Sequence, residues 1–361
     1  MNNDLNFTIE LLPPANNFDN IQIWQALNLA SRSLAELKGE SKTIPDMDIL
    51  INTLSLQESK ESSEIENIIT TQDDLFKSQV ANNPQNISAK EVRQYAAALL
   101  HGFNLIKQHG LLTSNHIIEI QGILEPNKPG FRKIMGTALK NSVGEIVYTP
   151  PQNYQKIVEL MSNLDKYINL PELHEVDPLI KMAIIHHQFE SIHPFYDGNG
   201  RTGRIINILY LVYMRLLDIP VLYLSRYINK NKTDYYRLLQ EVRTANKWNE
   251  WVVWVLKGVH ETSQQTITLI RKISLMMKEF KNKIQSEAEN IYSKSLLDSL
   301  FKHPYTKIKF IENDLNIHRQ TASKYLERLV ELGLLTSHKL GKSNYYINHE
   351  LFNLLSNANR L

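Results

Sequence analysis

Twelve consecutive residues, from His193 to Arg204, constrain this chain more than any other stretch. They read His-Pro-Phe-Tyr-Asp-Gly-Asn-Gly-Arg-Thr-Gly-Arg. Apolar residues recur at helical spacing before and after this stretch, which predicts two helices joined by a loop. Pro194 cannot donate a backbone hydrogen bond and is expected to end the first helix. Gly198-Asn199-Gly200 predicts a turn, because glycine and asparagine accept positive φ values, so the second helix should begin near Arg201.

The side chains of this loop suit the transfer of a phosphorus-containing group. A helix start carries unpaired N–H groups that bind anions, and Arg201 and Arg204 should project from one face of the first turn. Guanidinium groups hold phosphate oxygens at two points. Asp197 suits Mg²⁺, which takes few carboxylates and fills its shell with water and phosphates. His193 offers a neutral nitrogen as a base. The loop therefore predicts nucleotidyl or phosphoryl transfer to a hydroxyl group.

Each of these features also has an ordinary structural explanation when it stands alone. A histidine before a proline is usually structural, Asp-Gly-Asn-Gly is usually a turn, and paired arginines are usually solvated. Their joint occurrence favours the chemical interpretation. His186 and His187 precede the loop and raise the alternative of a transition-metal site with His193. Adjacent histidines face different directions on a helix, which disfavours that alternative.

The twelve residues resemble the signature of Fic-domain proteins, His-Pro-Phe-x-Asp/Glu-Gly-Asn-Gly-Arg-x-x-Arg, with every defined position filled. The resemblance implies transfer of AMP from ATP to a Ser, Thr or Tyr hydroxyl of a target protein. It implies that His193 deprotonates the hydroxyl and that Asp197 binds Mg²⁺. The residues it assigns to ATP and its phosphates are Gly198, Asn199, Gly200, Arg201, Thr202, Gly203 and Arg204.

A second motif lies ahead of this core, in the polar run 57–67 that follows a predicted helix. Its end resembles the Ser/Thr-x-x-x-Glu-Gly/Asn motif of regulated Fic proteins, filled here by Ser62, Glu66 and Asn67. The resemblance implies an N-terminal inhibitory helix. A carboxylate placed against Arg204 would occupy the guanidinium meant for the γ-phosphate. Without the core motif, an acidic run of this kind would be interpreted as a solvated helix face.

Residues 140–151 break the helical pattern around them. Gly144 is a turn residue and β-branched residues follow it, which predicts a short hairpin. In Fic proteins a hairpin flap holds the target segment by main-chain pairing. The resemblance therefore assigns target binding to Val143, Gly144, Glu145, Ile146, Val147 and Tyr148. Tyr235 and Tyr236, in a later predicted helix, are expected either in the core or, by the resemblance, beside the nucleoside.

The last third of the chain predicts a connector and a small domain. Gly258 is expected to close the core, and a long charged helix from Thr262 to Glu289 is expected to connect the domains and to offer a homodimer surface. The tail resembles a winged helix-turn-helix of two short helices and a two-stranded wing. Residues 301–361 carry nine Lys and Arg against five Asp and Glu. Its partner is left open between DNA and protein.

Length and composition set the domain organisation. The 361 residues predict a mainly α protein of two or three domains. We expect an N-terminal helical region with the inhibitory helix (1–110), a Fic helical core with a β-hairpin flap (111–258), a connecting helix (259–295) and a winged-helix domain (296–361). The absence of cysteine excludes disulfides and thiolate metal sites. Neither a spanning apolar run nor a secretory signal is visible, so a cytoplasmic protein without a membrane partner is expected.

The leading hypothesis is an ATP- and Mg²⁺-dependent protein adenylyltransferase, inhibited by its own Glu66, with self-modification as a candidate reaction. One alternative is a DNA-binding regulator whose Fic core only senses nucleotide. The intact His193 favours the transferase, because a sensor could discard the base. Another alternative is the removal of AMP, with Glu66 positioning a water molecule. The sequence leaves AMP removal open.

Overall fold

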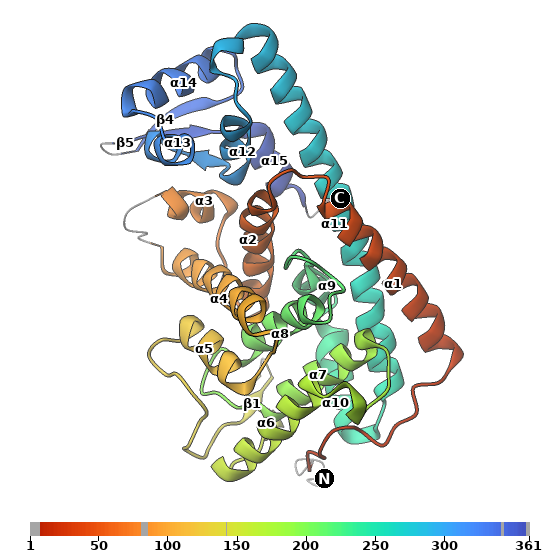
Figure 1. The fold of residues 1–361 in the computed structure, drawn as a ribbon. Coiled ribbons are helices and arrows are strands. Elements are labelled where there is room, and N and C mark those ends of the chain that lie inside the picture. The colour runs from red at the N-terminus through yellow and green to blue at the C-terminus, as the bar shows by residue number, and fades with distance from the viewer. Residues whose placement is uncertain (1–7, 81–85, 142, 341–342, 359–361) are drawn as a thin grey trace.

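Helices make up most of the residues that the computed structural model describes, which are 8–80, 86–141, 143–340 and 343–358 (Figure 1). The mainly α class is confirmed. The helices are α1 (Ile21–Ser41), α2 (Met47–Ile65), α3 (Gln72–Val80), α4 (Ile87–His109), α5 (Ser114–Leu124), α6 (Tyr154–Asn169), α7 (Pro178–Ile192), α8 (Asn199–Tyr213), α9 (Leu224–Lys230), α10 (Lys232–Ala245), α11 (Trp248–Glu287), α12 (Lys294–Lys302), α13 (Ile308–Leu315), α14 (Arg319–Glu331) and α15 (His349–Ser356). The strands are β1 (Leu139–Lys140), β2 (Ile146–Tyr148), β3 (Tyr305–Thr306), β4 (Thr336–Leu340) and β5 (Ser343–Ile347).

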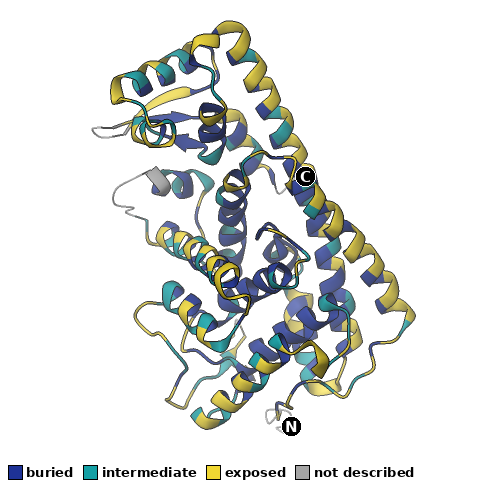
Figure 2. Ribbon diagram, in the orientation of Figure 1, coloured by how far each residue is buried: buried dark blue, intermediate teal, exposed yellow. Residues whose placement is uncertain are grey.

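The helices α7 and α8 form the centre of the molecule. Every residue of α7 from Leu179 to Ile192 is buried, as are nearly all residues of α8 (Figure 2). Their neighbours α4, α5, α6 and α11 cover them on several sides. A helix that is buried all round must be anchored by its neighbours. The loop from His193 to Gly198 is therefore held at the junction of two fixed helices.

The polar run 57–67 does not follow a helix but forms the second half of α2, which continues without a break to Ile65. Glu58, Glu61 and Ser62 are buried there. The cause is the position of α2, which packs against α4, α8, α9 and α12. The solvated face that such a composition usually indicates is therefore absent from this part of α2.

Gly258, which we expected to close the core, does not end a helix, because α11 runs as one helix of 40 residues across that position. A Cβ on Gly258 would lie 2.6 Å from Cδ1 of Tyr227, so the glycine permits close packing against α9. The predicted boundary between core and connector at 258/259 thus falls inside a helix. The helix α1 lies along α11 (Figure 1), and the apolar positions of α11 from Ile267 to Phe280 are largely buried within the chain. A homodimer stays a prediction.

The C-terminal region adds elements that the sequence did not predict. Its sheet has three strands in the order β3-β5-β4, all antiparallel, where we expected two. The helix α15 follows the sheet. This region contacts the first half of α2 through α12, and Lys302 forms an ion pair with Asp46 at 2.8 Å. Among the helices of the described residues, none is both long and apolar enough for a membrane span.

Candidate active site

The loop between α7 and α8 is shaped by two left-handed residues and one asparagine. His193 caps α7 with φ 48°, and Gly198 precedes α8 with φ 76°. Asn199 fastens the loop to itself, because its side chain accepts from the N–H of Phe195 at 2.8 Å and donates to the carbonyl of Phe195 at 2.9 Å. The helix thus begins at Asn199, two residues earlier than expected. A Cβ on Gly200, in its first turn, would lie 2.4 Å from Oε1 of Glu66 and 2.9 Å from Nη1 of Arg204, so the start of α8 lies against the Glu66–Arg204 pair.

Arg132, which the sequence analysis did not select, holds the loop from the flap side. Its N–H donates to the carbonyl of Pro194 at 2.9 Å, and its Nε donates to the carbonyl of His193 at 2.9 Å. The side chain is almost fully buried. It also donates to the carbonyl of Pro151 through Nη2. These bonds fix the main chain of His193 to the segment that carries the flap.

The imidazole of His193 is kept neutral at physiological pH. Burial, together with the positive charges of Arg132 and Arg243, lowers the pKa of His193 to about 4. The charge of Glu66 opposes this shift but does not outweigh it. Arg243 is itself held by Ser191, to which it donates at 3.0 Å, and its guanidinium lies 3.9 Å from the ring centre of Tyr148. A neutral imidazole is the form that can accept a proton.

The second arginine of the motif is held entirely by the end of α2. Arg204 donates from Nε to the hydroxyl of Ser62 at 2.7 Å, and from Nη2 to the carbonyl of Ser62 at 2.9 Å and to Oε1 of Glu66 at 2.8 Å. Arg204 is 2% exposed whereas Glu66 is 38% exposed, so the carboxylate covers a buried cation from outside. Burial would raise the pKa of Glu66, but the charge of Arg204 holds it below its usual value. Glu66 is therefore ionised at neutral pH.

The backbone at the end of α2 explains why an asparagine follows Glu66. Asn67 adopts φ 62°, a left-handed conformation that asparagine and glycine accept more readily than other residues. The N–H of Ile68 then returns to the carbonyl of Ser63 at 3.0 Å. This turn ends the helix directly after Glu66. The side chain of Glu66 can therefore reach Arg204 from the last turn.

A buried carboxyl group secures α2 one turn before the motif. Glu58 accepts from the hydroxyl of Tyr95 on α4 at 3.0 Å, from the N–H of Ser225 on α9 at 3.3 Å and from the Ser225 hydroxyl. Burial raises the pKa of Glu58 to about 8, although the hydrogen bonds oppose this shift. The group is thus largely protonated at neutral pH. It links α2 to α4 and α9.

Arg201 and its neighbours have different surroundings from Arg204. Arg201 is 4% exposed and pairs with Glu125 at 2.5 Å and Glu91 at 3.7 Å. Among the described residues its Nε and Nη1 have no hydrogen-bond partner, and Nη1 is the atom that lies 3.7 Å from Glu91. Thr202 and Gly203 are buried in α8. A Cβ on Gly203 would lie 2.5 Å from Oε1 of Glu190 on α7, so helix packing accounts for that glycine.

The expected Mg²⁺ ligand lies at the rim of the loop. Asp197 is exposed, and its Oδ1 accepts from the N–H of Gly198 at 2.7 Å. One exposed carboxylate fits Mg²⁺, which is usually held by one or two carboxylates and substrate phosphates. Within the described ranges, no group of three or more His, Cys, Asp or Glu forms a metal cage. The rings of His186 and His187 instead bond to Tyr235 and the Leu239 carbonyl in the core.

The tyrosines and the flap occupy distinct positions. Tyr235 is buried against Trp251 and Trp254, whereas Tyr236 is half exposed. The flap strands β1 and β2 pair antiparallel, with Leu139 opposite Tyr148. The hydroxyl of Tyr148 donates to the carbonyl of Ser191 at 2.7 Å. The other apolar flap residues, Val143, Ile146 and Val147, are exposed.

Sequence models of known families match three parts of the chain. Residues 111–211 match the Fic/DOC family, residues 24–104 match the Fic/DOC family N-terminal region, and residues 276–351 match the C-terminal domain described as "Protein adenylyltransferase SoFic-like". The chain belongs to the Fic/DOC family. Within that family it combines the family's N-terminal region with a SoFic-like C-terminal domain.

Individual relatives agree with this placement. The chain is 32% identical over 172 residues to protein adenylyltransferase fic-1 of Caenorhabditis elegans and 28% identical over 171 residues to that of Caenorhabditis briggsae, in each case covering 45% of this chain and 32% of the relative. The chain thus spans about a third of the length of these curated relatives. A crystal structure of a Fic family protein from Desulfovibrio desulfuricans has the same fold, with a TM-score of 0.59 at 17% identity over 93% of this chain and 98% of that one.

Proposed function

We propose that this chain is a protein adenylyltransferase that transfers AMP from ATP to protein hydroxyl groups and that Glu66 inhibits it. The observation that carries the proposal is the coexistence of two features. One is a neutral histidine beside a helix start with two buried arginines. The other is a carboxylate that already occupies one of those arginines. The similarity to proteins named adenylyltransferases supports the choice of AMP.

In the proposed reaction, the imidazole of His193 accepts the proton of the target hydroxyl. The hydroxyl oxygen then bonds to the α-phosphorus of ATP, and the bond from that phosphorus to the pyrophosphate oxygen breaks. Arg201 and Arg204, with the N–H groups that begin α8, bind the phosphates and stabilise the charge that develops on the pyrophosphate. When bound at Asp197, Mg²⁺ supplies further neutralisation of phosphate charge.

Inhibition follows from charge. A γ-phosphate bound at Arg204 would lie beside the Glu66 carboxylate, and like charges repel each other strongly where water is scarce. ATP must therefore displace Glu66 or bind in a pose that is unsuited to reaction. Two oxygens of Ser62 accept hydrogen bonds from the same guanidinium. Turning Arg204 away from α2 would break these bonds as well as the bond to Glu66. The inhibited state is the stable state of the chain.

The test is incorporation of label from ATP labelled on its α-phosphate, with Mg²⁺ and the full-length chain. Glu66→Gly should raise incorporation at least about tenfold, which corresponds to the loss of one charge-assisted hydrogen bond. Glu64→Gly is the matched control, because it places a glycine in the last turn of α2 without touching Arg204. His193→Ala in the Glu66→Gly background should abolish incorporation. Equal incorporation by wild type and Glu66→Gly would refute the inhibition, and no incorporation by any variant would refute the transferase.

A further inference from the structure

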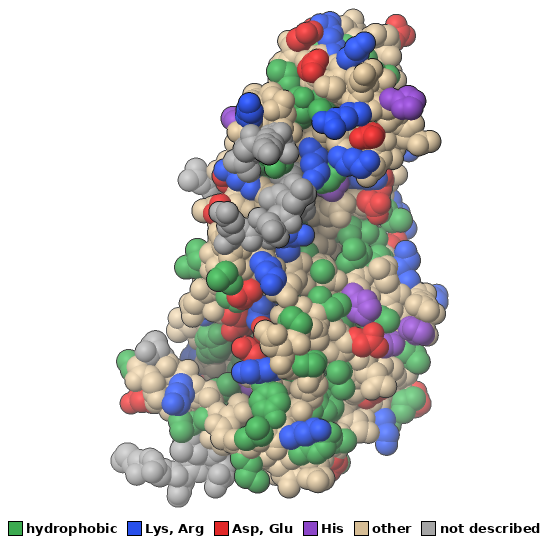
Figure 3. Space-filling model, turned by 90° about the vertical axis from the view of Figure 1, so that its left-hand side faces the viewer, with side chains coloured by type: hydrophobic (Ala, Val, Ile, Leu, Met, Phe, Trp, Pro, Cys, Tyr) green, Lys and Arg blue, Asp and Glu red, His purple; other side chains and the backbone are tan. Residues whose placement is uncertain are grey.

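The segment that leads into the flap, residues 131–138, has an irregular backbone between α5 and β1, and we call it the entry limb. It begins beside the loop between α7 and α8, where Phe131 forms an antiparallel bridge with Phe195. The limb lies in the lower part of the molecule in Figure 1, and Figure 3 shows hydrophobic side chains exposed over the lower part of this side. Ile134 and Met135, in the middle of the limb, are 71% and 70% exposed. Burial does little to fix such a segment, so its position depends on hydrogen bonds.

One side chain of the α7–α8 loop holds the middle of the entry limb. The hydroxyl oxygen of Tyr196 accepts hydrogen bonds from the N–H of Lys133 at 2.8 Å and from the N–H of Ile134 at 3.2 Å. Tyr196 lies three positions after His193 and directly before Asp197, so the limb is tied to the part of the loop that carries the proposed base. The Fic signature leaves the position of Tyr196 undefined and therefore gives it no task.

The next residues of the limb are held in a different way. The side chain of Gln152 accepts from the N–H of Gly136 at 2.7 Å and donates to the carbonyls of Thr137 at 2.9 Å and Pro150 at 2.6 Å. These bonds join the limb to the segment that returns from β2. The bonds to Tyr196 instead join the limb to the α7–α8 loop. Tyr196 therefore governs where the entry side of the flap lies relative to that loop.

We propose that Tyr196 is a positioning residue for AMP transfer, whose hydroxyl fixes the entry limb so that a target segment bound by the flap presents its own hydroxyl to His193. The inference rests on the function proposed above and on main-chain binding of the target by the flap. Reacting atoms must approach to about 3–3.5 Å, and a misplacement of about 1 Å can lower a rate about a hundredfold. A limb that shifts on the loop would displace the target hydroxyl in this way.

The effect of Tyr196 on the reaction is separable from an effect on the fold. Tyr196 is 39% exposed, and Lys133 and Ile134 are exposed as well. Water can therefore replace the hydroxyl as the acceptor for the two N–H groups, so its removal should cost the fold little. The phosphates are proposed to bind at Arg201, Arg204 and the start of α8, which the entry limb does not form. Loss of the hydroxyl should thus slow transfer without weakening ATP binding.

The test compares full-length variants in the Glu66→Gly background, which removes the carboxylate from Arg204. Label transfer from ATP labelled on its α-phosphate is measured with Mg²⁺ at saturating ATP, both on the chain itself and on casein added as an unfolded acceptor protein. Tyr196→Phe should lower the rate about tenfold, whereas the dissociation constant of ATP, measured by calorimetry, should stay within about twofold of the parent value. Hydrogen exchange should become faster at the amides of Lys133 and Ile134.

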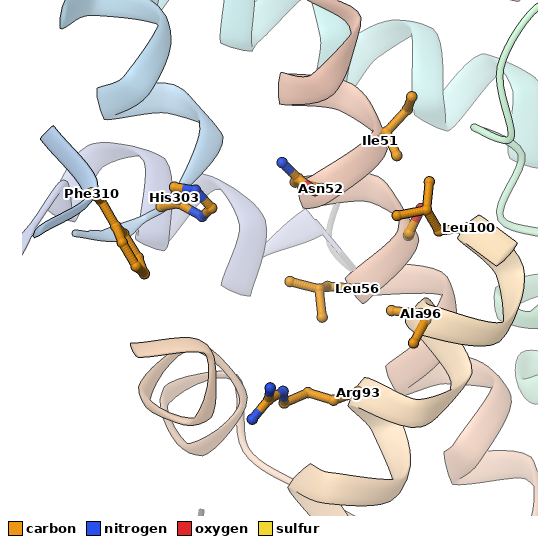
Figure 4. Close-up of a pocket in the computed structure, with 10 residues that line it drawn as sticks. Ile51, Asn52, Leu56, Arg93, Ala96, Leu100, His303 and Phe310 are labelled. Carbon is orange, nitrogen blue, oxygen red and sulfur yellow. The ribbon is translucent and has the colours of Figure 1, made fainter. Parts of the chain in front are cut away.

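Two control variants should transfer label at the parent rate. Tyr154→Phe removes the hydroxyl of another tyrosine near the limb, whose ring centre lies 5.7 Å from Nζ of Lys133. Arg93→Gln removes an exposed donor that bonds to the carbonyl of Ser78 at 2.8 Å, beside the groove between α2, α4 and the C-terminal region (Figure 4). The first controls for the loss of a nearby hydroxyl, and the second controls for the loss of a hydrogen bond elsewhere.

Each other outcome has a distinct meaning. A parent-like rate in Tyr196→Phe, or unchanged exchange at Lys133 and Ile134, would overturn the positioning role. A loss of ATP affinity as large as the loss of rate would also overturn it, because the hydroxyl would then support the phosphate site. Faster exchange throughout α7 and α8 would indicate general loosening and would overturn it too. Absence of label transfer by the Glu66→Gly parent would instead overturn the proposed function on which the role rests.

Discussion

At the scale of single residues, the neutral state of His193 is set by charges that come from distant parts of the chain. Arg132 precedes the flap, and Arg243 belongs to α10. Both act with burial to lower the pKa of His193 to about 4. The imidazole can therefore accept a proton throughout the physiological pH range.

Replacement of Arg243 should change the pH dependence of the reaction. In the Glu66→Gly background, label transfer should be level between about pH 6 and 8, because the imidazole of His193 stays unprotonated there. Arg243→Gln removes a positive charge, so the imidazolium becomes easier to form and the acid limb moves to higher pH. Arg243→Lys keeps the charge and should keep the profile. Superimposable profiles for Arg243→Gln and its parent would contradict this electrostatic explanation.

The Glu58 carboxyl group should give the stability of the fold a measurable pH dependence. Its pKa is about 8 in the folded chain, above the ordinary value, so between about pH 4.5 and 8 the folded state holds a proton that the unfolded state has released. Stability from this group is complete below the unfolded pKa and is lost as pH rises, by at most about 1.4 kcal/mol per pH unit. Glu58→Gln should not lose stability in this way. Its free energy of unfolding should therefore rise relative to that of the wild type as the pH approaches 8. Denaturant unfolding at several pH values measures the difference, and parallel curves would contradict it.

At the scale of elements, α2 is a helix whose polar side chains form hydrogen bonds with other helices instead of with solvent. Its first half packs against the C-terminal region, and its second half supplies Glu58, Ser62 and Glu66 to partners on other helices. A left-handed turn at Asn67 ends it. The position of the Glu66 carboxylate therefore depends on where the helix ends.

Substitution of Asn67 should test this dependence. The residue is exposed, so a change there acts mainly through the backbone. Asn67→Val should disfavour the left-handed turn by about 1–2 kcal/mol, because a β-branched residue resists positive φ, and should raise label transfer severalfold by freeing Glu66. Asn67→Gly accepts the turn and should leave transfer at the wild-type level. Equal label transfer by the two variants would show that inhibition does not depend on the geometry of this turn.

At the scale of the whole molecule, side-chain contacts join the C-terminal region to α2 and α3. Lys302 on α12 pairs with Asp46 at the start of α2, and the hydroxyl of Tyr305 donates to Asp73 of α3 at 2.5 Å. Burial opposes ionisation of Asp46, but the bond to Lys302 keeps its pKa below the usual value. The C-terminal region thus supports the position of α2.

Removal of this ion pair should loosen α2 from its N-terminal end. Lys302→Ala should lower the free energy of unfolding by about 1 kcal/mol, the upper range for a pair that keeps some exposure to water. It should also speed hydrogen exchange in the first turns of α2. Lys309→Ala breaks a pair with Glu312 that lies within α13, and is the matched control. Exchange in α2 that responds equally to both substitutions would contradict a specific role for Lys302.

The partner of the C-terminal region stays open between DNA and protein. Arg319, Gln320 and Lys324 are exposed at the start of α14, where a DNA-reading helix would present them. A gel-shift titration against salt decides the question. Duplex binding that weakens steeply with salt indicates phosphate contacts, and absence of a shift at low salt favours protein contact.

Sequence alone located the loop from His193 to Arg204, because it is a short motif whose chemistry is local. The inhibitory role of Ser62, Glu66 and Asn67 stays a prediction. It also predicted most helices, because apolar spacing reports which face of a helix is buried. It placed a domain boundary at Gly258, which lies inside α11, because in sequence a glycine that permits contact with Tyr227 looks the same as one that ends a helix. It also missed α9 and the strand β3, which are short.

Tertiary structure alone decided which groups surround that loop. Arg132, Arg243, Glu58 and Glu125 lie far from the motif in sequence and carry no signature of their own. Their effects on His193, α2 and Arg201 come from distance and burial, which arise only when the helices pack. Local sequence can specify a turn or a helix face, but the pKa of a buried group depends on every charge that the fold brings close to it.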